Sequence, residues 1–253
     1  MTALKHTGNM SDLEPSKLSQ LLDRRQRLRL EYEDLEGTRI ENDLERIDDM
    51  VYAVTRNCDE LYEEFSWWDE FEGYDQTTAE ERKEFDQEYS RIFHNCVTAI
   101  YSLINHTQRF VNKYGDESFR DKYSSTVKEY ELSERAHFLT QLRHYTQKRT
   151  LPPLRRFRHS PGGDKDDVHR VIVQKEDLLE WDGWNATARE YITGLDNRID
   201  VTEQALDYRA AVVDFYDWFD GFAKDEFEEE LKLSKMMYED FMNYDPRLRS
   251  PDW

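Results

Sequence analysis

The chain has 253 residues, of which 36% are charged and 38% are hydrophobic, and its formal net charge is −20. This excess of carboxylates excludes nucleic-acid binding by the average surface, and the 13% of aromatic residues argues against intrinsic disorder. No apolar run approaches the ~20 residues of a membrane span, and no basic start with a short apolar stretch marks a secretory signal. Glycine and proline are scarce, at nine and six residues. We therefore expect a soluble, cytoplasmic and mainly helical protein.

The N-terminal part of the chain predicts a tail followed by long helices. Residues 1–16 show no periodicity, whereas the leucines between residues 18 and 35 predict a first helix. Thr38-Arg-Ile-Glu41 reads as a capping box that starts a new helix after Gly37; the alternative is one bent helix through this point. Apolar residues then recur at alternating spacings of four and three, and such a heptad seam requires a long partner helix. They are Ile40, Leu44, Ile47, Val51, Val54, Cys58, Leu61, Phe65 and Trp68.

The middle of the chain predicts three further helices. Thr78-Ala-Glu-Glu81 is a second capping box, and the apolar stripe behind it predicts a helix that ends at Gly115. Two shorter helices follow, near residues 117–131 and 134–149. Ser133 is the expected N-cap of the second.

The helical pattern stops at Leu151-Pro-Pro153. Two short runs, Leu154–His159 and Val168–Gln174, flank the turn-rich segment 160–167, so we predict a β-hairpin with a mobile tip. Helix is expected again at about 176–195.

A last helix is expected to start behind the cap Asp200-Val-Thr-Glu203. Its apolar stripe continues to Tyr238, which predicts one long element. Its exposed face is rich in carboxylates, as a solvated helix face usually is.

Together these elements predict an all-α fold, a bundle of long antiparallel helices with a small β-hairpin insertion near 154–174. The expected organisation along the chain has four parts. They are a flexible tail at 1–16, a long helical hairpin at 17–75, a helical bundle at 76–245 and a C-terminal tail at 246–253. The long seam and the many aromatic residues exceed what one short bundle usually buries, so we expect a homodimer, for which twofold symmetry is the commonest arrangement.

Neither the cysteines nor the histidines predict a metal or a cofactor. Cys58 and Cys96 fall on apolar faces of predicted helices, as buried thiols of a reducing compartment do. Glu134-Arg-Ala-His137 has the spacing of one ligand pair of a di-iron centre, but such a centre needs a second pair that the sequence lacks. We therefore expect no metal and no cofactor.

The one strongly basic stretch lies between Glu134 and Asp164. The 29 residues of this basic window, 135–163, carry seven Arg and Lys and no acidic residue, so its charge of +7 leaves −27 on the rest of the chain. Arginine interleaved with Tyr145 and Phe157 suits a phosphate backbone with unstacked bases. RNA contacts are expected from Arg149, Arg155, Arg156 and Arg158. The open alternative is that these cations pair with the protein's own acidic helices.

Part of this window resembles a known pattern. The segment Leu142-Arg-His-Tyr-Thr-Gln-Lys-Arg-Thr-Leu-Pro152 resembles the "LRNYxQHxxLP" motif of uncharacterised all-α prokaryotic proteins that are similar to the HEPN superfamily. The preceding helix adds a polar stripe, and the resemblance extends over residues 85–220. The stripe consists of Asn95, Ser102, His106 and Arg109.

The resemblance implies a function as well as a fold. HEPN proteins are helical bundles, often dimeric, and many are metal-independent ribonucleases of toxin and antiviral systems, while others only bind RNA or nucleotides. In active members, Arg and His from two protomers meet at the scissile phosphate, the 2′-hydroxyl attacks, and a cyclic phosphate remains. The resemblance carries this catalytic role to Arg143, His144 and Lys148.

This chain departs from the motif at two positions. His144 replaces the Asn, and Lys148 replaces the His that follows five residues after Arg143. Lysine ordinarily titrates near pKa ~10.4 and is a poor general base at neutral pH. The sequence therefore predicts an RNA-binding protein or a weak ribonuclease of a defence or stress system. The alternative is a non-catalytic dimeric scaffold or interaction protein whose basic residues are neutralised internally.

Overall fold

The computed structural model describes the backbone of residues 15–70, 78–148, 155–159 and 168–244, and the side chains of 16–63, 78–148 and 172–244. The described chain is almost entirely helical with one small sheet, which confirms the predicted fold class. Within these ranges no helix has the length and apolar character needed to cross a membrane.

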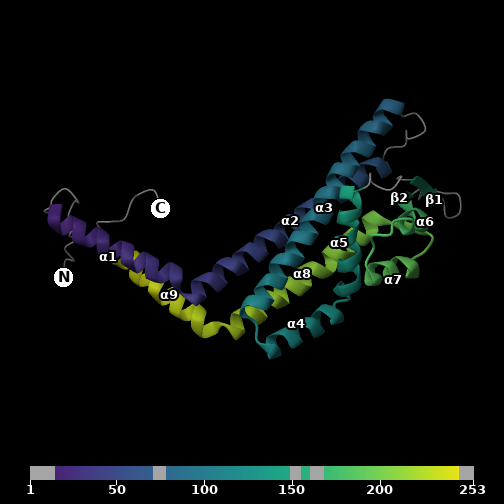
Figure 1. The fold of residues 1–253 in the computed structure, drawn as a ribbon. Coiled ribbons are helices and arrows are strands. Elements are labelled where there is room, and N and C mark those ends of the chain that lie inside the picture. Colours follow the sequence, from purple (N-terminus) through teal and green to yellow (C-terminus); the bar gives the residue numbers. More distant parts are fainter. Residues whose placement is uncertain (1–14, 71–77, 149–154, 160–167, 245–253) are drawn as a thin grey trace, which may run out of the picture. The chain divides into compact units, whose positions relative to one another are not determined.

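The elements follow one another along the chain as labelled in Figure 1. The helices are α1 (Pro15–Asp34), α2 (Glu36–Glu70), α3 (Ala79–Tyr114), α4 (Glu117–Glu129), α5 (Leu132–Lys148), α6 (Lys175–Leu179), α7 (Ala186–Gly194), α8 (Val201–Glu226) and α9 (Glu228–Asn243). The strands are β1 (Arg155–His159), β2 (Val168–Gln174) and β3 (Arg198–Asp200).

The chain forms two compact units. The larger unit comprises residues 46–219, and the smaller unit comprises residues 1–45 together with 220–253. Helices α2 and α8 contribute residues to both units. The predicted tails, 1–16 and 246–253, fall almost entirely outside the described residues.

In the larger unit, the heptad seam of α2 meets partners from the same chain. Cys58 and Leu61 are fully buried. The Cys58 sulfur lies 2.9 Å from that of Cys96 on α3 and 4.0 Å from the carbonyl oxygen of Ala205 on α8. The hydrogen bond to Cys58 and burial raise the pKa of the Cys96 thiol, so the Cys96 thiol stays protonated at neutral pH. The expected buried thiols are confirmed; Phe65 and Trp68 lie outside the described side chains.

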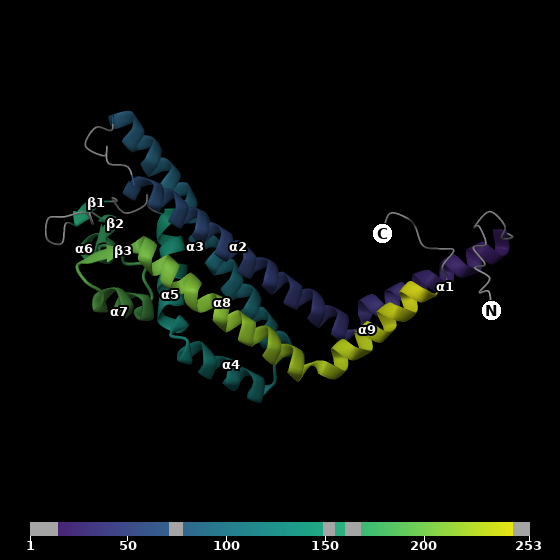
Figure 2. The same ribbon diagram turned by 180° about the vertical axis from the view of Figure 1, so that it is seen from behind.

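Aromatic packing joins α3, α4 and α8. The ring of Phe219 lies 5.7 Å from that of Phe110 and 6.3 Å from that of Phe119, both edge-on. Edge-to-face contacts of this kind add to the free energy gained by burial. Figures 1 and 2 show α3 and α8 running along each other, with α5 beside α3. This packing fixes the helices that carry the candidate site.

In the smaller unit, α1 packs against α9. Their rings of Tyr32 and Tyr238 lie 5.5 Å apart. A Cβ at position 37 would overlap the backbone carbonyl of Glu230, so glycine is needed for the first turn of α2 to approach α9. The hydroxyls of Thr38 and Ser234 form a buried hydrogen bond of 2.8 Å.

Two of the four predicted N-terminal helix caps are wrong. Helix α2 begins at Glu36 after a break at Leu35, so Thr38 lies inside the helix and its hydroxyl bonds Ser234 instead of capping. Helix α5 begins at Leu132, which puts Ser133 in its first turn rather than at the N-cap. The capping box at Thr78 is confirmed, as is the Asp200 cap, whose carboxylate accepts from the Glu203 amide at 3.0 Å.

Two long predicted helices are interrupted. The expected helix at 176–195 splits into α6 and α7 around a tryptophan turn, in which the Trp184 indole donates to the Leu178 carbonyl at 2.6 Å. A Cβ at Gly183 would overlap the ring of Trp181. The last helix breaks at Phe227, where the backbone leaves the helical region, giving α8 and α9.

The predicted pairing of the two strands is confirmed, and a third strand extends the sheet; the predicted mobile tip at 160–167 lies outside the described residues. Strands β1 and β2 are antiparallel, with Arg156 opposite Val171, and β3 pairs antiparallel with β2 through Ile199 opposite Val173. The order is β1-β2-β3. Strand β3 was not predicted, because three residues before a helix cap carry no recognisable strand pattern.

Candidate functional site

Helix α5 places its motif residues against α3. Its apolar residues Phe138, Leu139, Leu142 and Tyr145 are buried in the larger unit. Because successive helical residues are ~100° apart, Arg143 is left at the margin of this buried face. There it meets α3, which packs against α5 (Figures 1 and 2).

The guanidinium of Arg143 lies over the ring of Tyr101. Its central carbon is 4.3 Å from the ring centroid, within the range of a cation–π interaction. The Nε atom of Arg143 is buried and has no hydrogen-bond partner among the described residues. No carboxylate of the described chain pairs with it, although the sequence contains 55 acidic residues. Arg143 is therefore a partly exposed cation that lies over Tyr101 and has no carboxylate partner among the described residues.

His144 contacts the same tyrosine. Its ring lies 5.8 Å from that of Tyr101 in an edge-on arrangement of 76°. Burial, followed by the positive charges of Arg143 and Lys148, lowers the pKa of His144 below its ordinary value. The imidazole is therefore neutral at pH 7 and can accept a proton.

Lys148 lies apart from this pair. Its ammonium is 6.0 Å from the ring centroid of Trp181, in the last turn of α5. Of the three predicted catalytic residues, Arg143 and His144 thus converge on Tyr101, while Lys148 contacts a different aromatic side chain. Its charge still affects the pKa of His144.

A polar face of α3 completes the site. His94 Nδ1 lies 3.4 Å from the hydroxyl of Thr146, which itself donates to the Arg143 carbonyl at 2.9 Å. Because that hydroxyl is already a donor, His94 is the donor to it. The hydroxyl of Thr98 is buried without a partner in the described structure. We call His94, Thr98, Tyr101, Arg143 and His144 the α3/α5 polar face.

The polar stripe predicted from the sequence is a different one on α3. That stripe contains Ser102, whose hydroxyl bonds the carbonyl of Thr98 on its own helix at 3.0 Å, and Arg109, which is exposed. Tyr101, the centre of the observed contacts, was missed. Its signal is the spacing of His94, Thr98 and Tyr101, four and three residues apart on one helical face.

The basic window is only partly described. Arg135 pairs with Asp207 of α8 at 3.4 Å, as the internally neutralised alternative expects for this residue. Arg149 lies outside the described residues, and so do the side chains of Arg155, Arg156 and Arg158, whose backbone forms β1. Whether these arginines gather near Arg143 stays a prediction.

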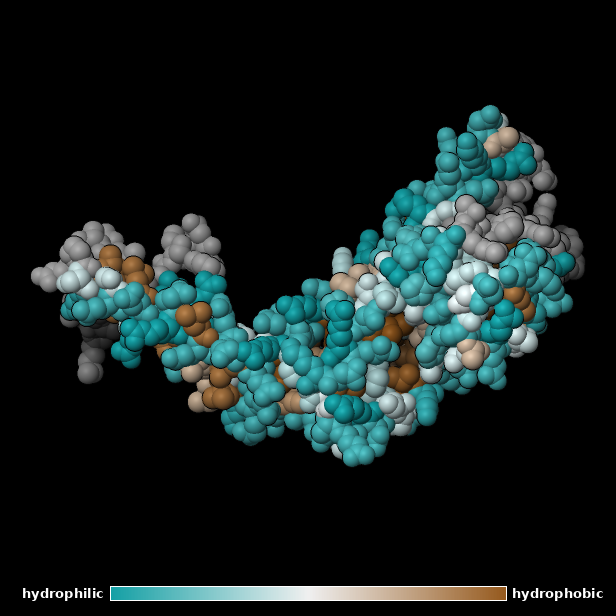
Figure 3. All heavy atoms as spheres, viewed as in Figure 1, coloured by the Kyte–Doolittle hydropathy of each residue, from teal (hydrophilic) through white to brown (hydrophobic). Residues whose placement is uncertain are grey.

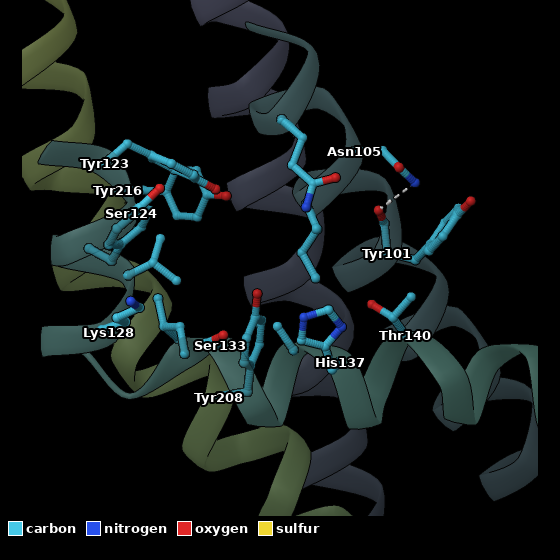
Figure 4. Close-up of a pocket in the computed structure, with 16 residues that line it drawn as sticks. Tyr101, Asn105, Tyr123, Ser124, Lys128, Ser133, His137, Thr140, Tyr208 and Tyr216 are labelled. Atoms are coloured by element: carbon cyan, nitrogen blue, oxygen red, sulfur yellow. Dashed lines mark hydrogen bonds between the residues drawn. The ribbon is translucent and has the colours of Figure 1, made fainter. Parts of the chain in front are cut away.

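A cavity of about 430 Å³ adjoins the α3/α5 polar face and shares Tyr101 with it. Figure 4 shows it between α3, α4, α5 and α8. As for metal sites, no group of three or more His, Cys, Asp or Glu among the described residues is arranged to hold an ion.

No protein-family model, curated protein or solved structure matches this chain. A function must therefore be argued from the geometry of its own residues.

Proposed function

We propose that the α3/α5 polar face binds single-stranded RNA in the manner of a HEPN-like protein, with weak metal-independent ribonuclease activity. The observation that carries the proposal is Arg143, a cation without a carboxylate partner among the described residues, in a chain of net charge −20. The guanidinium of Arg143 lies over the ring of Tyr101, and the neutral imidazole of His144 lies beside it.

This arrangement suits a phosphodiester. A guanidinium presents several donors in a fixed plane and binds phosphate oxygens in pairs. Arg143 is half-buried, so its terminal nitrogens, rather than the buried Nε, are the donors proposed to contact the ligand. A ring already contacting the guanidinium restricts its rotamers, which lowers the entropic cost of binding. The acidic remainder of the chain disfavours binding elsewhere.

The same residues support slow cleavage. His144, neutral at pH 7, takes the proton from the ribose 2′-hydroxyl as that oxygen attacks the adjacent phosphorus. Arg143 stabilises the charge that develops on the phosphoryl oxygens. The bond from phosphorus to the 5′-oxygen breaks, and that oxygen leaves with a proton from solvent. The products are a 2′,3′-cyclic phosphate and a 5′-hydroxyl.

The first test is binding of a fluorescein-labelled single-stranded RNA, followed by anisotropy at low salt. Arg143→Ala should weaken binding about tenfold and lower the slope of log K against log salt by about one, since one charged phosphate contact is lost. The control is Arg109→Ala, which removes an exposed cation from α3 and should leave both values unchanged. No binding by the wild type at low salt, or equal effects of the two variants, would contradict the proposal.

A second test separates the candidates for the base. His144→Ala should abolish formation of the cyclic phosphate, whereas Lys148→Ala should retain it, because Lys148 contacts Trp181 rather than the Arg143 pair. Loss of cleavage only in Lys148→Ala would assign the role to the lysine.

A second candidate function is that of a homodimeric interaction protein, and a separate observation favours it. Helices α1 and α9 expose apolar side chains to between 44% and 58%, and Figure 3 shows hydrophobic areas over these two helices. They are Leu22, Leu30, Leu233, Met236 and Tyr238. Association through this surface is compatible with RNA binding by the other unit. Light scattering tests it: a mass of one chain at micromolar protein would exclude the dimer.

A further inference from the structure

The cavity beside the α3/α5 polar face has the properties of a small-molecule site. Its volume of about 430 Å³ lies within the ~300–1,000 Å³ of ligand pockets, and all residues that line it belong to the larger unit. In Figure 3, apolar side chains between α5 and α8 are visible within an otherwise hydrophilic surface.

The charge of its lining differs from that of the chain. The lining contains Lys128 and His137 but no Asp or Glu, whereas the sequence contains 55 acidic residues. Lys128 is exposed on α4 and stands at the rim. A cavity of this kind admits an anionic group and does not repel it.

A buried tyrosine hydroxyl is aimed into the cavity without a partner. Tyr208 of α8 is 2% exposed, and Figure 4 shows its hydroxyl directed into the open space. No described residue hydrogen bonds to it. Burial raises the pKa of Tyr208 above its ordinary value, so it stays a protonated donor at neutral pH.

The neighbouring Tyr216, in contrast to Tyr208, has a hydrogen-bond partner for its hydroxyl. The Tyr216 hydroxyl lies 2.7 Å from that of Thr107, which already donates to the Leu103 carbonyl, so Tyr216 donates to Thr107. Tyr123, in contrast, resembles Tyr208: burial raises its pKa to about 12, and no described group bonds its hydroxyl. Two phenol donors are therefore available to a ligand.

Aromatic and neutral polar side chains form the walls of the cavity. Phe215, Tyr216 and Tyr101 supply aromatic surface, and Thr140 and Asn105 supply neutral polar groups. Aromatic walls favour a planar ring, while phenol donors and a lysine favour an oxyanion. We propose that this cavity binds a small aromatic anion, a planar ring that carries one carboxylate or phosphate. The cavity adjoins the α3/α5 polar face and shares Tyr101 with it, but Arg143 and His144 do not line it, and this proposal does not depend on RNA binding.

The experiment uses 1-anilinonaphthalene-8-sulfonate, a fluorescent aromatic anion, with the full chain. One molecule should bind per chain, and 4-hydroxybenzoate or adenosine 5′-monophosphate should displace it; which of the two does so distinguishes a carboxylate from a phosphate ligand. The neutral counterparts, 4-hydroxybenzamide and adenosine, should displace it at least tenfold less well.

Three variants locate the site. Tyr208→Phe removes only the unpartnered hydroxyl, Lys128→Gln removes the rim charge, and Ala136→Leu fills the cavity; each should weaken binding several-fold or more. The matched controls are Tyr52→Phe, at an exposed position of α2, and Lys122→Gln, on α4 but outside the cavity. They should bind as the wild type does.

Two results would overturn the proposal of an aromatic-anion site. No binding of the probe, or binding that Tyr208→Phe and Ala136→Leu both leave unchanged, excludes an aromatic-anion site here. Far-ultraviolet circular dichroism and a cooperative melt establish that each variant is folded; a variant that unfolds is replaced by Thr140→Leu, which narrows the cavity from α5. Arg143→Ala should retain probe binding, so failure of the RNA proposal and failure of this one give different results.

Discussion

The two units of this chain differ in how completely each one buries its apolar side chains. Among the described residues, eleven of the twelve largest fully buried side chains belong to residues 46–219, and one, Ile40, belongs to the smaller unit. The large apolar side chains that are exposed by half or more are aliphatic in the smaller unit, namely Leu30, Leu233 and Met236, whereas in the described part of the larger unit they are the tyrosines Tyr52 and Tyr62, whose hydroxyls suit contact with water. A unit with a full core can devote surface residues to a ligand site, whereas one with exposed apolar side chains is suited to association.

A core truncation in the larger unit is the strongest test of the difference between the two units. Phe215→Ala removes a ring that is 1% exposed and that contacts Tyr123, Tyr130 and Tyr216. We expect a loss of ~3–5 kcal/mol in the free energy of unfolding, as for other buried Phe→Ala changes. Urea denaturation followed by circular dichroism measures it. Leu233→Ala, at an exposed position of α9, is the control; a similar loss there would remove the distinction between the units.

The next largest effect should come from substitution of Gly37, which lies against the backbone of α9. Gly37→Ala places a Cβ against the backbone carbonyl of Glu230, which cannot move away as a side-chain tip can. We expect a loss of ~1–3 kcal/mol, confined to the smaller unit. Hydrogen exchange should show faster amide exchange in α1 and α9 but unchanged protection in α3 and α8. Uniform acceleration in all helices would mean that the units do not unfold separately.

Association can be separated from stability. Leu30→Glu together with Met236→Glu places charges at half-exposed positions of α1 and α9. The free energy of unfolding should therefore change by no more than about 0.5 kcal/mol. If the dimer forms through this surface, light scattering should shift from two chains to one. Retention of a dimer by this double variant would assign the interface to another surface.

The smallest expected effect is the pH dependence that His144 adds to stability. Its pKa is lowered in the folded chain, so the unfolded chain binds more protons near and below the ordinary value of ~6.5. The contribution of neutral His144 is complete above that pH and is lost as the pH falls through the folded-state pKa. The wild type should therefore lose stability relative to His144→Gln between pH 7 and pH 5. The opposite trend would mean that a carboxylate stabilises the imidazolium.

The sequence predicted elements well where local pattern and tertiary packing agree. The seam of α2 and the capping box at Thr78 are cases of this kind, because heptad spacing and a cap pattern are local and strong. The start of α2 failed because Thr38 has the residue type of a cap but its hydroxyl is used by Ser234, nearly two hundred positions away.

The candidate site was predicted only in part, for a similar reason. Arg143 and His144 are visible in a motif, but Tyr101 precedes them by more than forty positions, and only the antiparallel packing of α3 on α5 brings it to them. The cavity was not predicted at all. Tyr208 carries no sequence signal, since it reads as one more aromatic residue of an apolar stripe.

The most direct test of the central proposal is hydrogen exchange of the full chain with and without saturating single-stranded RNA. Amides exchange more slowly where a ligand covers or stabilises a helix. The proposed function predicts added protection in α3 around residues 94–105 and in α5 around residues 137–148, with none in α1 and α9. Protection confined to α1 and α9, or no change at saturating RNA, would contradict RNA binding by the α3/α5 polar face.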